Sequence, residues 1–306
     1  MTRRADGAAV VIAFIMAGLQ TVSGGEALPS IPIPHSIARV VDARWNPSIP
    51  PDYILIQDIH LHPEAQANIA AVLLFVHAHW GVRNVLVEGA YAGQPVSVDR
   101  WTGNNHQALR SALQEGSLGG PEMAAAMAPG RDLALAGLED PELYRQNLQA
   151  FDGVRQEVTD AVNDLKTLEV MQRSLDMTQT RFSEEELQTM DLLVHLKMKP
   201  AEWSTFQKAS FAMPESTALA GALAKAQMFY RLADMRSQFF LKAAEASESA
   251  GPKVLVVGGF HTAAMAARLA QEGKSYVVIS PQITQSGFED LYEHRMQESI
   301  SALKLR

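Results

Sequence analysis

The 306-residue chain contains no cysteine. This absence excludes disulfide bonds, a thiolate nucleophile and a zinc–thiolate site. It also leaves no cysteine that a lipid anchor would need. The fold must therefore be stabilised by its hydrophobic core, and 306 residues are enough for one large domain or two small ones.

Positive charge is scarce. The chain has 26 Lys and Arg against 34 Asp and Glu, which gives a formal net charge of −8. This balance argues against a general nucleic-acid binder. Apart from Arg3 and Arg4 there is no basic run, so the sequence has no polybasic patch for a membrane surface.

Several common signatures are missing as well. The sequence has no G-x-S-x-G elbow, no P-loop, no G-x-G-x-x-G after its first apolar strand and no H-E-x-x-H. Serine hydrolases, nucleotide-binding proteins and zincins therefore lose support as function classes.

Residues 1–27 have the pattern of a secretory signal peptide. Arg3 and Arg4 precede an apolar stretch, Ala8 to Leu19, that is too short to span a bilayer comfortably, and small residues up to Ala27 suit a cleavage site. We predict an exported protein, periplasmic or extracellular, without stable membrane insertion once the signal is removed. An uncleaved anchor is the alternative.

The remaining chain predicts an α/β fold. Residues 28–52 are rich in proline and form an extended lead-in with an edge strand near 38–41. Residues 53–306 form a single α/β domain with a mainly parallel sheet and flanking helices. Only helical periodicity appears at about 141–247, which predicts an inserted all-helical lobe. The main strands are expected in the segments 54–62, 84–87, 133–138, 253–257 and 275–279.

Four of these strands end in histidine or acid groups. The first leads into Asp58, His60 and His62, and the second is followed by Glu88. The third ends at Glu139 and Asp140, and the fourth leads into Gly258-Gly259-Phe260-His261. Because ligands of open α/β sheets bind outside the carboxyl ends of the strands, these groups are expected to converge on one pocket.

The histidines after the first strand suit chemistry at a helix start. Strand alternation would place Asp58, His60 and His62 on one side, with Asp58 orienting a histidine. The positive potential of a helix N-terminus favours a neutral ring, the form required of a metal ligand. Because Pro63 follows it, His62 has a helix cap as its alternative role.

The other strand ends offer complementary groups. A carboxylate at Glu88 is costly after a buried strand unless it is paired or faces a cleft. The glycine turn before His261 exposes backbone amides, which suits an anion site beside an acid/base group. One of Glu139 and Asp140 is expected to cap the next helix. Arg236 either neutralises these carboxylates, binds an anionic substrate or lies on the surface.

These stretches resemble the superfamily that joins ChaN-like haem-binding proteins, TraB/GumN and Tiki-type metalloproteases and erythromycin esterases. The similarity lies in Gln57-Asp58-Ile59-His60, Leu86-Val87-Glu88-Gly89, Ala136-Gly137-Leu138-Glu139-Asp140 and Gly258-Gly259-Phe260-His261. It covers about half of the chain after residue 27. Gln57 and Asp58 stand where the family usually has glycine and then Glu or Thr.

The residues and the resemblance together imply a hydrolase of ester or peptide bonds. His60, Glu88 and His261 would hold a divalent metal (Zn, Mn or Co) or act as acid/base groups, assisted by Asp58. His62, Glu139 and Arg236 are further candidates for binding a cofactor. The partner would be a small-molecule or peptide substrate, and the oligomeric state stays open. The alternatives are a haem or other tetrapyrrole binder of the ChaN-like type and a catalytically silent binding domain.

Overall fold

The computed structural model describes residues 31–103, 105–174, 182–209, 212–249 and 251–284. Its centre is one six-stranded sheet with the order β1-β6-β2-β5-β3-β4. All neighbouring strands run parallel except β1 and β6. The predicted α/β class with a mainly parallel sheet is confirmed. The strands are β1 (Ala38–Arg44), β2 (Tyr53–Asp58), β3 (Asn84–Tyr91), β4 (Ala134–Glu139), β5 (Lys253–Gly258) and β6 (Tyr276–Pro281).

The strand order places β5 between β2 and β3. Ile54, Leu55 and Ile56 of β2 are fully buried, as are Val254 and Leu255 of β5. Continuous apolar runs are typical of parallel strands that are covered on both faces. The sheet thus has at its centre two strands that are far apart in the sequence.

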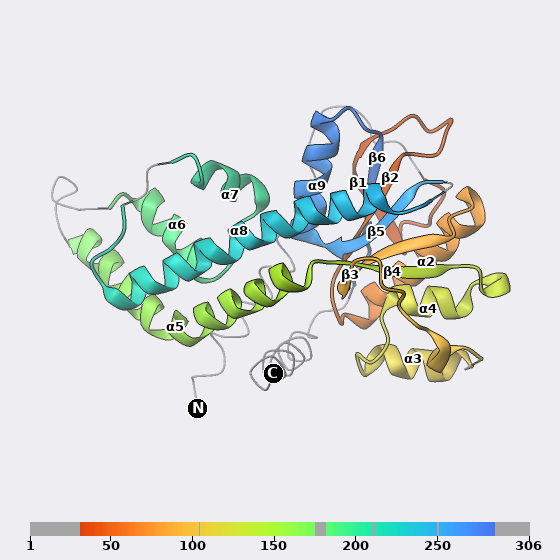
Figure 1. Cartoon of the computed structure of the whole chain (residues 1–306). Helices are drawn as coiled ribbons and strands as arrows, with labels where there is room; N and C mark the ends of the chain where they lie inside the picture. The colour runs from red at the N-terminus through yellow and green to blue at the C-terminus, as the bar shows by residue number, and fades with distance from the viewer. Residues whose placement is uncertain (1–30, 104, 175–181, 210–211, 250, 285–306) are drawn as a thin grey trace.

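Helices cover both faces of the sheet (Figure 1). Helices α2 (Pro63–Trp80) and α4 (Gly120–Met127) pack on one face, where Ile69 and Ala124 meet Ile54 and Ile56. Helix α9 (Gly259–Gln271) packs on the other face, where Met265 joins Leu55. The short α3 (His106–Gln114) lies before α4 in the chain.

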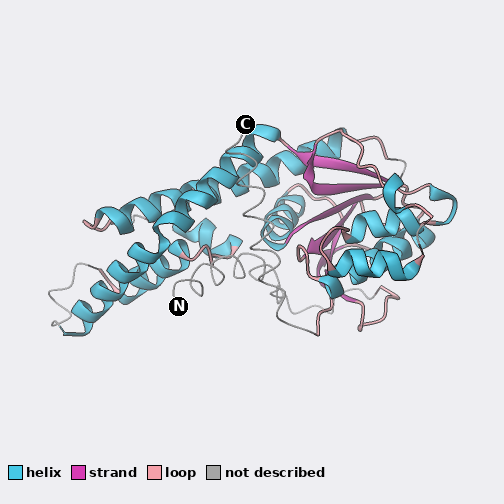
Figure 2. Ribbon diagram, turned by 90° about the horizontal axis from the view of Figure 1, so that it is seen from below, coloured by secondary structure: helices cyan, strands magenta, loops and turns pink. Residues whose placement is uncertain are grey.

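In the described residues between β4 and β5, four helices form the lobe: α5 (Pro141–Ser174), α6 (Glu184–Val194), α7 (Pro200–Phe206) and α8 (Thr217–Ala246). Helices α5 and α8 lie side by side and project away from the sheet (Figures 1 and 2). At 1.5 Å per residue, α5 is about 50 Å long. The lobe has its own core, in which Trp203 and Tyr230 are buried. Ser183 caps α6 in a capping box with Glu186.

The C-terminal half of α8 leaves the lobe and packs on the sheet, where Phe240 and Leu241 join the same core as α9. Because this helix is continuous from Thr217 to Ala246, its two halves belong to the lobe and to the layer that covers the sheet. The lobe is therefore joined to the α/β part by packing as well as by the chain.

The N-terminal part of the described chain forms an edge strand. The predicted edge strand near 38–41 exists as β1, which extends to Arg44 and pairs antiparallel with β6. The predicted signal peptide at 1–27 lies outside the described residues. No helix in the described parts of the chain combines the length and apolar character needed to cross a membrane.

Candidate functional site

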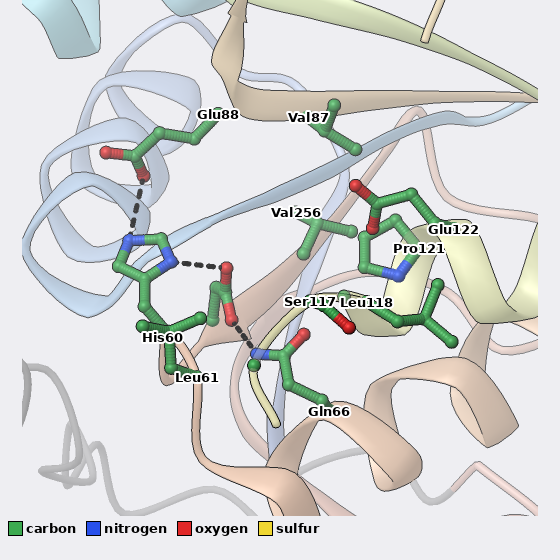
Figure 3. Close-up of a pocket in the computed structure, with 13 residues that line it drawn as sticks. His60, Leu61, Gln66, Val87, Glu88, Ser117, Leu118, Pro121, Glu122 and Val256 are labelled. Carbon is green, nitrogen blue, oxygen red and sulfur yellow. Dashed lines mark hydrogen bonds and ion pairs between the residues drawn. The ribbon is translucent and has the colours of Figure 1, made fainter. Parts of the chain in front are cut away.

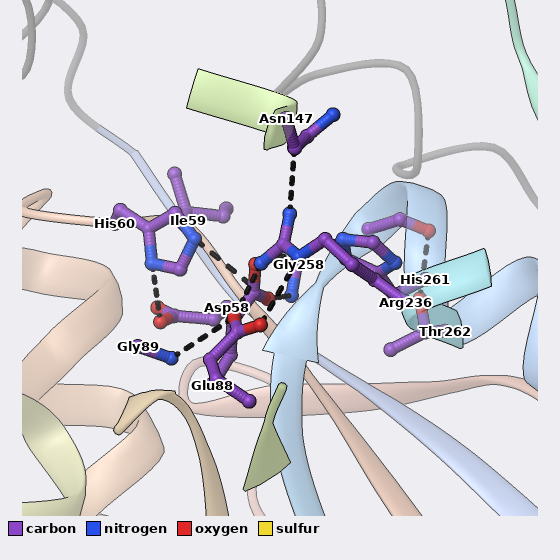
Figure 4. Close-up of polar contacts among 12 residues, drawn as sticks. Asp58, Ile59, His60, Glu88, Gly89, Asn147, Arg236, Gly258, His261 and Thr262 are labelled. Atoms are coloured by element: carbon purple, nitrogen blue, oxygen red, sulfur yellow. Dashed lines mark hydrogen bonds and ion pairs between the residues drawn. The ribbon is translucent and has the colours of Figure 1, made fainter. Parts of the chain in front are cut away.

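The carboxyl ends of β2, β5, β3 and β4 are neighbours along one edge of the sheet. Asp58 pairs in register with Gly258, and β5 pairs with β3 on its other side. The polar residues that follow these strands therefore meet, as Figure 4 shows. The structure brings together Asp58, His60, Glu88, Glu139 and His261, with Arg236 among them.

His60 is held by Asp58. Its Nδ1 lies 2.6 Å from Asp58 Oδ2, while its Nε2 lies 4.0 Å from Glu88 Oε2. A carboxylate only accepts hydrogen bonds, so Nδ1 carries the shared hydrogen and Nε2 is the atom directed at Glu88. Burial alone would lower the pKa of His60, but the Asp58 carboxylate outweighs it and raises this pKa to about 9.

The expected alternation of Asp58, His60 and His62 along one strand is wrong. β2 ends at Asp58, and Leu61 has a left-handed backbone with φ of 60°. His62 is then the N-cap of α2, where its Nδ1 accepts the Ala65 N–H at 3.3 Å. A turn at residues 60–61, in which the His62 N–H bonds to the Ile59 carbonyl at 3.2 Å, thus interrupts the strand geometry before Pro63 begins the helix.

Glu88 lies between the two histidines. Its Oε2 accepts the backbone N–H of Gly258 at 2.7 Å, and its Oε1 accepts Arg236 at 2.7 Å. The same Oε1 is 3.5 Å from His261 Nε2. Burial alone would raise the pKa of Glu88, but the cationic groups around it and the Gly258 amide hold this pKa well below its usual range. Glu88 is therefore a fixed negative charge.

Arg236 joins the lobe to the strand ends. From α8, its guanidinium donates to Glu88 and to both oxygens of Glu139, with the Nε–Oε2 distance at 3.1 Å. A third nitrogen donates to Asn147 of α5 at 2.9 Å. Glu139 is fully buried and Arg236 is 5% exposed, so the interpretation as a surface arginine is wrong. Asp140, next to Glu139, caps α5 through the Glu142 and Leu143 amides.

His261 is buried in the first turn of α9, at 1% exposure. Its Nδ1 is 2.8 Å from the Ser237 hydroxyl, and its Nε2 has no hydrogen-bond partner among the residues that the structure describes. The Ser237 hydroxyl also donates to the Ala233 carbonyl at 2.9 Å. Burial lowers the pKa of His261 to about 4, helped by Arg236 and opposed by Glu88. A neutral ring with an unpartnered buried nitrogen therefore faces Glu88.

A cavity of about 240 Å³ lies beside His60 (Figure 3). Asp58, Glu88 and Glu122 line it, together with Gln66 and the 116–119 loop before α4. The His60 side chain is 31% exposed, whereas His261 is not among the lining residues. His60 is thus the imidazole that a small molecule in the cavity would meet.

Sequence reasoning missed four residues of this region: Gln66, Glu122, Asn147 and Ser237. None of them belongs to a strand-end motif, because all four come from helices. Gln66 had a usable signal, since a polar side chain on the apolar part of α2 needs a partner. For Ser237, the sequence signal was its position next to Arg236, which was itself a candidate residue.

The imidazole nitrogens and the carboxylate of this site are of the chemical types that bind divalent cations. Two imidazole Nε2 atoms face one carboxylate, their Nδ1 atoms are held by Asp58 and Ser237, and His261 Nε2 is an orphaned buried atom. Among the described residues, no three such side chains already surround one point as ligands. His60 and His261 face different oxygens of Glu88.

No family model, curated protein or solved structure matches this chain. The resemblance to the ChaN-like, Tiki-type and erythromycin esterase superfamily therefore stays a prediction that rests on four short strand-end motifs.

Proposed function

We propose that the protein is a hydrolase of ester or peptide bonds, with His60 as the reactive imidazole. The observation that carries this proposal is the Asp58–His60 pair, which directs His60 Nε2 toward Glu88 at a small cavity. An Asp–His pair beside a pocket, with shifted pKa values around it, is a common arrangement in acid/base catalysis.

The side chains around the cavity can supply both proton transfers of hydrolysis. With its pKa raised to about 9, His60 carries a proton at neutral pH and can give it to the leaving oxygen or nitrogen. Burial raises the pKa of Glu122, which lines the same cavity and can accept a proton from the attacking water. Water oxygen bonds to the carbonyl carbon as the ester or amide bond breaks. Solvent then restores both groups.

A divalent cation is the candidate cofactor, and His60, Glu88 and His261 are the residues that would hold it. When bound, such an ion would polarise the scissile carbonyl and lower the pKa of a water molecule. The unpartnered Nε2 of His261 favours this version, since the acid/base version leaves that nitrogen without a role. In either version Asp58 fixes the His60 ring, and Arg236 fixes Glu88.

No comparable observation favours haem. The cavity beside His60 is lined by carboxylates, and about 240 Å³ falls below the roughly 300–1,000 Å³ typical of pockets for drug-sized ligands. The haem alternative, the silent binding domain and export by residues 1–27 all remain predictions from the sequence.

The test is hydrolysis of p-nitrophenyl esters and fluorogenic peptides by the purified protein, with and without chelator and added Zn, Mn or Co. His60→Ala should abolish hydrolysis, whereas His79→Ala, which changes an exposed histidine of α2, should not. Loss of activity with chelator would select the metal version, and full activity would select the acid/base version. Equal activity of His60→Ala and the wild-type protein would refute the proposal.

A further inference from the structure

Gln66 lies in the first turn of α2 and is 4% exposed. Its side-chain amide connects three segments: the end of β2, the turn after it and the start of α4. Oε1 accepts the backbone N–H of Gly120 at 2.7 Å. Nε2 donates to Asp58 Oδ1 at 2.6 Å and to the Ile59 carbonyl at 3.1 Å.

The hydrogen-bonding chemistry of these partners permits only one orientation of the Gln66 side-chain amide. A backbone N–H can only donate, so the atom that meets Gly120 must be the amide oxygen. The amide nitrogen then faces Asp58 and the Ile59 carbonyl, both of which only accept. Because Asp58 Oδ1 is engaged by Gln66, Oδ2 is left for His60 Nδ1 (Figure 3). The direction of every hydrogen bond from Gly120 to His60 is therefore determined.

The helices that carry this chain of bonds approach each other very closely. A Cβ at Gly120 would lie 2.4 Å from the Gln66 backbone oxygen and 2.9 Å from Ile69 Cβ. Only glycine allows this approach. The N-terminus of α4, whose Pro121 and Glu122 line the cavity, is thus pressed against the residue that holds Asp58.

We propose that Gln66 is a positioning residue, which sets the orientation of His60 through Asp58 and ties it to the N-terminus of α4. The inference deepens the proposed function and rests on His60 being the reactive group. Its consequence is that one wall of the cavity and the imidazole at its mouth move together. A substrate that displaces α4 would thereby reorient His60.

The experiment uses full-length Gln66→Met, which keeps the length of the side chain but removes the amide. Asn68→Ala is the matched control, since Asn68 lies on the same helix and donates instead to the Gln282 carbonyl. The readout is the NMR signal of the His60 Nδ1 hydrogen. We expect a low-field, slowly exchanging signal in the wild type and Asn68→Ala, and loss of that signal by exchange in Gln66→Met.

Where hydrolysis is measurable, kcat of Gln66→Met should fall roughly 10- to 100-fold while KM changes little, because the imidazole is misplaced rather than removed. An unchanged His60 signal in folded Gln66→Met would overturn the proposal. If that variant does not fold, the wild type decides: Gln66 side-chain amide protons that exchange as fast as those of exposed Gln156 would overturn it. Both NMR readouts need neither substrate nor metal, so they are independent of a failed hydrolase assay.

Discussion

Arg236 and Glu139 form a two-point ion pair with almost no exposure to solvent. The arginine comes from the lobe and the glutamate from the end of β4, 97 residues apart in the chain. Burial raises the pKa of Glu139, and the guanidinium opposes this rise. Because Glu139 is fully buried, its carboxylate depends on Arg236 and on the Gly89 N–H, which donates to Oε1 at 3.4 Å.

We expect Arg236→Met to lower the free energy of unfolding by roughly 3–5 kcal/mol, the usual cost of leaving one member of a buried ion pair alone. Urea denaturation measures this change. Arg268→Met is the control, since Arg268 pairs with Glu272 at the surface and should change stability by about 1 kcal/mol or less. Equal effects of the two substitutions would contradict a structural role for the Arg236 cluster.

Gly258→Ala should disable the site without disturbing the fold. Gly258 has φ of −55° and ψ of 154°, which alanine also adopts. The new methyl would lie 3.5 Å from Glu88 Oε2 and 3.8 Å from His60 Nε2, in the space between them. We expect the unfolding midpoint to stay close to that of the wild type, and hydrolysis or uptake of a divalent ion to fall by about tenfold or more. Gly251→Ala is the matched control, because its methyl would lie 3.8 Å from the Trp80 carbonyl oxygen, an ordinary van der Waals contact.

His261 should carry its hydrogen on Nδ1. The single hydrogen of the Ser237 hydroxyl is directed at the Ala233 carbonyl, so Ser237 can only accept from the ring. Nitrogen-15 NMR distinguishes the two tautomers. In Ser237→Ala we expect both tautomers. Ser280→Ala, which changes a buried hydroxyl with no hydrogen-bond partner in the described part of the chain, should have no effect. A wild-type ring with its hydrogen on Nε2 would show that Ser237 donates instead.

The edge strand β1 gives a prediction for alkaline pH. Tyr276 of β6 donates to Asp42 of β1 at 3.2 Å, and burial together with Asp42 raises the pKa of Tyr276 to about 12. The ordinary value is about 10, so the unfolded chain loses this proton first. The stability from this pair is complete below pH 10 and is lost as the pH rises through 12. Comparing Tyr276→Phe with the wild type across this range should show their difference in unfolding free energy shrinking toward high pH.

The strands and their polar ends were predictable because each apolar run is buried on both faces. The side chain of a polar residue directly after such a run must lie at the carboxyl edge of the sheet. His60, Glu88, Glu139 and His261 could be named on that basis. The strand order was not predictable, since periodicity defines an element but not its neighbours. Nothing in the sequence near Glu88 indicates that Gly258 donates to it from the next strand.

The helical contributions were harder to predict for a different reason. Arg236 and Ser237 reach the site because α8 continues from the lobe onto the sheet, and a helical pattern does not reveal which end of a long helix meets which partner. Asn147 and Gln66 act through single hydrogen bonds to groups distant in the sequence. Such hydrogen bonds produce no periodic pattern in the sequence.

The position of β5 between β2 and β3 has a consequence for the order of folding. β2, β3 and the first helices are synthesised early, but the strand that joins them comes after the whole lobe, at Lys253–Gly258. Until then Glu88 lacks its Gly258 amide, and the two early strands have no shared neighbour. Pairings between such distant segments form slowly. The nascent chain should therefore remain incompletely folded, and dependent on protection from aggregation, until β5 has been made.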